Sequence, residues 1–144
     1  MTNLHQFNDY SIRLLNKNDS TDLFELIERN RKRLEDFFSG TCARTKTYED
    51  TKTYLEEVEL KIENKTYFPF VVISDNTNSL IGFFDVKNIE WKIPKAELGY
   101  FMDEAHAGKG IATKAFSFVV SHCINEFKMK KLLIRTHESN IASR

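Results

Sequence analysis

Cysteine is scarce in this chain, and its two copies lie far apart. Cys42 and Cys123 are the only cysteines among the 144 residues, so neither a disulfide framework nor a closely spaced metal-binding pair is expected. Two reduced thiols are typical of a cytoplasmic protein. The N-terminal segment also lacks the basic region and apolar core of a secretory signal peptide. We therefore expect a cytoplasmic location.

Proline, glycine and net charge are also low. Two prolines and five glycines leave no obvious linker, and a chain of this length predicts a single domain over residues 1–144. Lys+Arg and Asp+Glu both number 21, so no general attraction to nucleic acid or to an anionic membrane is expected. No stretch approaches the roughly 18–20 apolar residues that a membrane-spanning helix needs.

The chain does contain a clear succession of strand and helix patterns. Strands are predicted at 11–15, 68–74, 80–91, 96–102 and 131–136. Apolar residues at helical spacing follow three starts, at Asn18–Ser20, Thr47 and Gly110. The middle three strands predict an antiparallel meander, and the last helix predicts a crossover to a parallel strand. The expected fold is α/β, with helices over one mixed sheet.

The segment AGKGIAT, at Ala107–Thr113, joins a predicted strand to a predicted helix. The first amides of a helix lack partners and carry a partial positive charge of about half a unit. Gly108 and Gly110 let a ligand approach the backbone, Ala112 keeps that approach open, and Thr113 adds a hydroxyl. Such a loop suits a pyrophosphate, and a glycine turn without a ligand is the alternative.

The spacing of this loop excludes two common nucleotide motifs. A Walker loop needs a glycine five residues before Gly108, and none is present. A dinucleotide-binding loop needs a glycine three residues after Gly110, where the chain has Thr113.

Three segments occur in an informative order. They are ELGYFMD at Glu97–Asp103, GKGIAT at Gly108–Thr113 and LLIRTHESNIAS at Leu132–Ser143. Together they resemble the GNAT acetyl-CoA-dependent N-acetyltransferases, most of all the branch that acetylates the N-termini of ribosomal proteins. The resemblance implies a mostly antiparallel GNAT sheet with flanking helices. It also implies acetyl-CoA as cosubstrate, no metal, and a primary amine as acceptor, such as a protein N-terminus.

The resemblance also implies where acetyl-CoA binds. The cofactor is expected in a V-shaped opening between the strands at 97–102 and 131–136, with its pantetheine arm paired to the backbone near Phe101 and Met102. The residues implied for the rest of the cofactor are Ala107, Gly108, Lys109, Gly110, Ala112, Thr113 and Asn140. Ala107 stands where the family has Gln or Arg, so its backbone amide remains while a side-chain contact is lost.

The implied chemistry is direct attack of a neutral amine on the thioester, without a metal or a covalent intermediate. Glu97 resembles the acidic position that serves as base in many relatives, and its alternative is a solvent-facing carboxylate or a pair with a lysine. We expect Ser143 to assist the departing thiolate. The alternative for both Ser143 and Asn140 is a role at a helix N-terminus.

The resemblance has one large departure. Relatives continue past the third segment with a helix and further strands, whereas this chain stops at Arg144. The chain is expected to be a fragment, a naturally short version, or one completed by a second chain. The strand at 131–136 is then left with an open edge, which favours self-association. A non-catalytic acyl-CoA-binding domain, a truncated remnant, a small-molecule amine acetyltransferase and an interaction domain remain alternatives.

Two further groups of residues invite a functional interpretation. Arg29, Arg31, Lys32 and Arg33 form a basic cluster that predicts either contact with an acidic partner or a solvated helix face. The aromatic residues Trp91, Phe83 and Phe84 predict either an acceptor groove or ordinary sheet packing.

Overall fold

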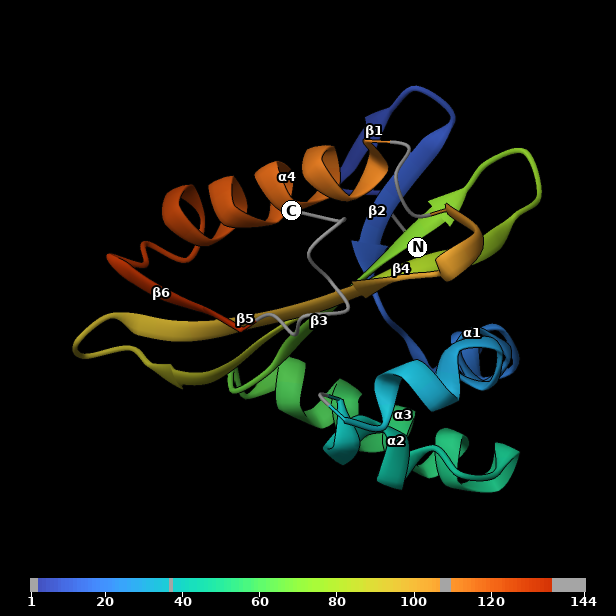
Figure 1. Cartoon of the computed structure of the whole chain (residues 1–144). Coiled ribbons are helices and arrows are strands. Elements are labelled where there is room, and N and C mark those ends of the chain that lie inside the picture. Colours follow the sequence, from blue (N-terminus) through green and yellow to red (C-terminus); the bar gives the residue numbers. More distant parts are fainter. Residues whose placement is uncertain (1–2, 37, 107–109, 136–144) are drawn as a thin grey trace.

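A computed structural model describes residues 3–36, 38–106 and 110–135. Within these ranges the strands form one six-stranded sheet, with α4 on one face and α1, α2 and α3 on the other (Figure 1). The strands are β1 (His5–Phe7), β2 (Tyr10–Leu14), β3 (Phe68–Ser74), β4 (Ser79–Glu90), β5 (Lys95–Met102) and β6 (Lys131–Arg135). The helices are α1 (Ser20–Leu34), α2 (Ser39–Arg44), α3 (Tyr48–Glu63) and α4 (Ile111–Asn125).

The strands lie in the sheet in chain order. Strands β1 to β5 pair antiparallel with their neighbours, and β6 pairs parallel to β5. A parallel neighbour requires a crossover, and α4 supplies it. The α/β class, the meander and the parallel last strand are therefore confirmed.

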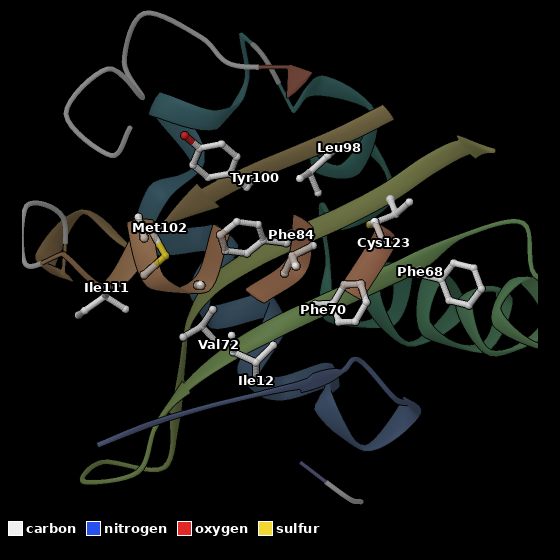
Figure 2. Close-up of a cluster of buried hydrophobic side chains, with 14 of the residues drawn as sticks. Ile12, Phe68, Phe70, Val72, Phe84, Leu98, Tyr100, Met102, Ile111 and Cys123 are labelled. Carbon is white, nitrogen blue, oxygen red and sulfur yellow. The ribbon is translucent and has the colours of Figure 1, made fainter. Parts of the chain in front are cut away.

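Alternating side chains divide the core into two layers, because neighbouring strand residues point to opposite faces of the sheet. Phe84 lies on the α4 side, where β-strand residues pack against Ile111, Ala115 and Val119 (Figure 2). Phe83 lies on the other side, against Leu23, Leu26 and Leu55 of α1 and α3. β3 is buried along its whole length, as expected for a strand covered by helices on both faces.

The helix starts follow capping chemistry, with one correction. The Thr47 side chain accepts from the Asp50 amide at 3.0 Å and begins α3 as predicted. The start predicted at Asn18–Ser20 is right in position, since Asp19 is the N-cap of α1, but Asp19 makes no side-chain cap bond to that helix. The capping side chain is that of Asn16, which caps the short 3₁₀ turn before α1. In that turn the Asp19 carboxylate also accepts from the Asn16 amide at 2.9 Å.

Two short elements were not predicted. β1 pairs with β2 through a turn in which Asn8 has a φ of 49°. α2 occupies the break expected around Gly40, and at six residues it is too short for a periodic apolar pattern. Within the described ranges, no helix combines the length and the apolar character that crossing a membrane requires.

Candidate active site

Strand β5 runs past the last described residue of β6, and its backbone edge there has no partner strand among the described residues. Their pairing is described from Lys95 opposite Lys131 to Gly99 opposite Arg135. β5 continues past that pair to Met102, still paired with β4 on its other side. Along Tyr100–Met102, the part of the chain that is described therefore supplies no strand beyond β5, and an extended ligand can pair there.

Phe101 and Met102 lie on this edge with fully buried side chains, at 0% and 1% exposure. Only their backbone groups can serve a ligand. The Met102 carbonyl already accepts from Arg33 Nη2 at 2.6 Å. Their expected contact with the pantetheine arm stays a prediction, limited to backbone groups.

Gly110 begins α4 at the end of the same strand-to-helix connection. Its φ of 75° is left-handed, which favours glycine, and no atom of the described residues lies within 4 Å of where a Cβ would stand. Among described residues, no side chain caps the first turn of α4, so the amides of that turn are available to an anion. Thr113 is exposed on this turn, while Ala112 is buried.

Five of the predicted site residues lie outside the described residues. They are Ala107, Gly108, Lys109, Asn140 and Ser143. Their expected roles toward the cofactor and the thiolate stay predictions.

Glu97 lies on the opposite face of β5 from α4, and both of its carboxylate oxygens are engaged. Oε1 accepts from Arg135 Nη1 at 3.2 Å, and Oε2 accepts from Asn88 Nδ2. Its side chain is 20% exposed. The sequence left open a solvent-facing carboxylate or a pair with a lysine. The structure shows neither, because the partner of Glu97 is an arginine on β6. Two donors fix the carboxylate, and each oxygen keeps a second lone pair for a proton.

A cavity of about 380 Å³ lies on the same face of the sheet as Glu97. Its walls come from α2, α3, β4 and β6, through Phe38, Ser39, Gly40, Thr41, Arg44, Tyr54, Lys61, Tyr67, Asp85, Lys87 and Arg135. Lys87 is the cross-strand partner of Glu97, and Arg135 is its ion-pair partner. The cavity, hereafter the α2–α3 pocket, is therefore the immediate neighbour of the predicted base.

A chain of buried hydroxyls runs through this pocket to a carboxyl. The hydroxyls of Tyr54 and Tyr67 are 2.9 Å apart, and Tyr67 donates to Asp85 Oδ2 at 2.8 Å. Burial raises the pKa of Asp85, while Lys87 and the Tyr67 hydroxyl oppose that shift. Burial also raises the pKa of Tyr54 and of Tyr67 well above the usual value for tyrosine, so both hydroxyls remain donors.

The sequence alone does not predict these hydrogen-bonded hydroxyls, although it contains one signal of them. Asp85 interrupts the apolar run LIGFFDV in a predicted strand. A carboxyl in such a position is seldom fully buried without partners. Its partners come from α3 and from the start of β3, which the sequence alone does not bring together.

The basic cluster on α1 has a structural role that neither sequence interpretation foresaw. Arg29 donates to the Leu80 carbonyl at 3.2 Å, and Arg33 donates to that of Met102. Arg31 donates to the carbonyls of Cys42 and Thr45 at 3.2 and 2.7 Å. These arginines tie α1 to β4, β5 and the α2 region.

Trp91, Phe83 and Phe84 do not share an acceptor groove, and the alternative of ordinary sheet packing is confirmed for Phe83 and Phe84. Phe83 and Phe84 are fully buried on opposite faces of the sheet. Trp91 packs edge-on against Phe68 and Phe127. Its Nε1 donates to the Lys65 carbonyl at 2.8 Å, which fixes the ring.

Both cysteines are free and buried, as expected, and burial raises the pKa of Cys123 to about 12. Across the described ranges, His, Cys, Asp and Glu side chains do not gather in groups of three that would suit a metal ion.

Comparison with known sequences identifies relatives of one kind. The sequence model of the acetyltransferase (GNAT) domain matches residues 10–144. The "probable N-acetyltransferase YjcK" of Bacillus subtilis (strain 168) is 27% identical over 133 residues, which are 92% of this chain and 74% of that protein. The ribosomal-protein-serine acetyltransferase of Escherichia coli (strain K12) is 24% identical over 124 residues, or 86% of this chain and 68% of that protein.

Comparison with solved structures gives the same fold. RimL, a ribosomal L7/L12 alpha-N-protein acetyltransferase solved in complex with coenzyme A, matches with a TM-score of 0.83 and 18% identity. The match covers 98% of this chain and 80% of that one. At this identity the likeness shows a shared fold, and it agrees with the family resemblance predicted from the three sequence segments.

Proposed function

The chain belongs to the acetyltransferase (GNAT) domain family, and from that premise we propose that it transfers the acetyl group of acetyl-CoA to the N-terminal amine of a protein. The family makes the chain an acyltransferase. The acceptor class rests on relatives whose names specify ribosomal proteins as their substrates. We propose a ribosomal protein N-terminus in the cytoplasm as the natural acceptor.

One observation carries this proposal. Among the described residues, no strand pairs with β5 beyond Gly99, and no side chain caps the first turn of α4, whose N-cap is Gly110. An extended, amide-containing arm fits the strand edge, and a pyrophosphate fits the helix amides. We assign the pantetheine arm to Phe101 and Met102. We assign the pyrophosphate to Ala107, Gly108, Lys109, Gly110, Ala112 and Thr113, and a further cofactor contact to Asn140.

In the proposed reaction the amine first becomes neutral by giving a proton to Glu97, directly or through water. The amine nitrogen then bonds to the thioester carbonyl carbon, and the carbon–sulfur bond breaks. The coenzyme A thiolate leaves and takes a proton from the Ser143 hydroxyl, and the second proton that the amine nitrogen loses restores that hydroxyl, so the products are the amide and the free thiol. The ion pair with Arg135 holds the Glu97 carboxylate on the face of the sheet that carries the α2–α3 pocket, which is the entry we propose for the acceptor.

A second candidate is an acyl-CoA-binding domain without turnover. It is favoured by the two donors that occupy both oxygens of Glu97. It predicts acetyl-CoA binding without acetyl transfer.

Turnover of a peptide amine, followed through release of coenzyme A thiol, tests the proposed function. We expect Glu97→Gln to lower kcat about a hundredfold, the size of a general-base contribution, and to leave acetyl-CoA affinity unchanged. Glu90→Gln is the matched control, because it removes the same charge from an exposed pair with Lys95 on the same sheet. Unchanged turnover in Glu97→Gln would exclude Glu97 as the base. Absence of turnover in the native chain would favour the binding-domain candidate.

We also propose that the chain self-associates through β6. This strand presents Leu133 and Ile134 at 57% and 36% exposure, and exposed apolar edge strands favour pairing. Sedimentation velocity across a concentration series tests this, and a single monomer at high concentration would contradict it.

A further inference from the structure

The α2–α3 pocket carries charges of both signs in separate places. Its cationic side chains are Arg44, Lys61, Lys87 and Arg135. Arg44 is paired with Glu57, and Arg135 with Glu97. In the part of the chain that is described, Lys61 and Lys87 have no carboxylate within ion-pair distance. Neither ammonium group therefore forms an ion pair within the described residues, although Lys87 acts on the Asp85 carboxyl at longer range.

Aromatic rings support these two lysines. The Lys61 ammonium lies 5.6 Å from the centroid of the Tyr67 ring, and that of Lys87 lies 5.8 Å from the centroid of the Phe38 ring. A cation over a ring face is attracted to it, so both ammonium groups are held beside the pocket. An anionic group entering between them would meet both charges.

The floor of the pocket has the opposite character. Asp85 is buried, and its Oδ2 accepts from Tyr67. Its Oδ1 meets no donor at hydrogen-bond geometry among the described residues, while the nearby Gly99 backbone opposes the rise in the pKa of the carboxyl. A buried acceptor without a donor is uncommon in folded proteins, and it is satisfied when a ligand brings a donor.

Gly99 lets Asp85 Oδ1 lie close against β5. A Cβ at position 99 would lie 3.1 Å from Asp85 Oδ1. Asp85, Gly99 and Arg135 form one row across β4, β5 and β6, and the Gly99–Arg135 pair is the last described before β5 runs on alone. The carboxyl therefore lies at the start of the edge assigned above to the cofactor.

We infer that the α2–α3 pocket selects acceptors whose first residue is acidic. The N-terminal amine donates to Asp85 Oδ1, and the side-chain carboxylate of the same residue binds between Lys61 and Lys87. A pocket of about 380 Å³ accommodates one such residue with its neighbour. This inference rests on the proposed function, because it assigns the acceptor side of the same site.

Binding of matched peptides tests the inference without requiring turnover. Three hexapeptides serve as probes: one begins with Glu, one begins with Gln, and one is the Glu peptide with its N-terminus already acetylated. Calorimetric titration of the native chain with saturating coenzyme A present gives a Kd for each. We expect the Kd of the Gln peptide and that of the acetylated peptide each to be about tenfold higher than the Kd of the Glu peptide. Each of the two peptides lacks one charged contact.

Two variants assign the contacts. Lys61→Met with Lys87→Met keeps the apolar stems and removes both charges, so the Kd ratio of the Gln and Glu peptides should fall to about one. Asp85→Asn keeps an acceptor for Tyr67. In this variant the acetylated and free Glu peptides should bind with nearly the same Kd, while the Kd ratio of the Gln and Glu peptides should stay as in the native chain. The lysine variants change one exposed and one half-buried side chain and leave Asp85 in place, so the inference stays testable if Asp85→Asn fails to fold.

The outcomes separate the inference from the proposed function. Equal binding of the Glu and Gln peptides by the native chain would overturn the inference, and so would equal binding of the free and acetylated Glu peptides. Acetyl transfer with no preference for an acidic first residue would support the proposed function alone. Charge-dependent peptide binding without transfer would support the pocket assignment and contradict the proposed reaction.

Discussion

Tyr67 holds the buried carboxyl of Asp85, so the substitution Tyr67→Phe removes one hydroxyl and leaves a buried charge without its donor. The hydroxyl donates to Asp85 Oδ2 at 2.8 Å, and Oδ1 has no other partner among the described residues. Leaving a buried charged acceptor unpaired costs about 1–3 kcal/mol. We expect the free energy of unfolding at neutral pH to fall by that amount in Tyr67→Phe.

The loss of stability in Tyr67→Phe should depend on pH, and the environment of Asp85 decides whether it grows or shrinks as pH rises. Burial raises the pKa of this carboxyl in the folded chain. The folded chain therefore loses stability as pH rises above the pKa of about 3.9 that aspartate has in the unfolded chain. Removing the Tyr67 donor, which opposes that shift, raises the folded pKa further. The difference between native and Tyr67→Phe chains should therefore be small near pH 4 and grow toward pH 7.

Urea unfolding at several pH values, followed by circular dichroism, measures this difference. Tyr48→Phe is the matched control, because the Tyr48 hydroxyl is at 3.4 Å from Ser20 on an exposed surface, and its loss should cost less than about 0.5 kcal/mol. A loss in Tyr67→Phe that is below this value, or that is the same at pH 4 and pH 7, would refute the account of the buried chain.

Two further stability predictions follow from single contacts. Thr47→Ala removes the cap of α3, in which the side chain accepts from the Asp50 amide at 3.0 Å, and should lower the free energy of unfolding by about 1 kcal/mol; an unchanged urea midpoint would contradict it. Gly82→Ala places a Cβ 2.5 Å from Met102 Sδ and 3.2 Å from Val72 Cγ2, and should cost about 1–3 kcal/mol through overpacking. Gly40→Ala is its control, since no atom lies within 4 Å of a Cβ there, and equal unfolding energies for the two variants would be evidence against overpacking.

The sheet could be predicted because its strands carry strong local patterns. The run FPFVVIS is apolar and β-branched throughout, and β3 occupies those residues. Element ends differ from the prediction by one residue at β2, β4 and β5. α2 was missed because six residues around Gly40 have no periodic face, and β1 because its three residues depend on pairing with β2.

The site could be predicted only in part. Glu97 and Gly110 could be named because they fall in segments that resemble a family, but the ion pair of Glu97 joins residues on two strands separated by a helix. The α2–α3 pocket was out of reach, since Tyr54, Tyr67 and Asp85 come from different elements. Such long-range pairings depend on the packed fold and leave only weak traces in the sequence, here one carboxyl in an apolar strand.

Binding of acetyl-CoA to the first turn of α4 is the central claim, and titration calorimetry of three chains tests it most directly. Gly110→Ala and Gly110→Glu share the strain of a side chain at a φ of 75°, but only glutamate puts a negative charge where the pyrophosphate is assigned. We expect acetyl-CoA to bind the native chain, to bind Gly110→Ala more weakly, and to bind Gly110→Glu at least about tenfold more weakly than Gly110→Ala. Equal affinity of the two variants, or no binding by the folded native chain, would contradict the assignment.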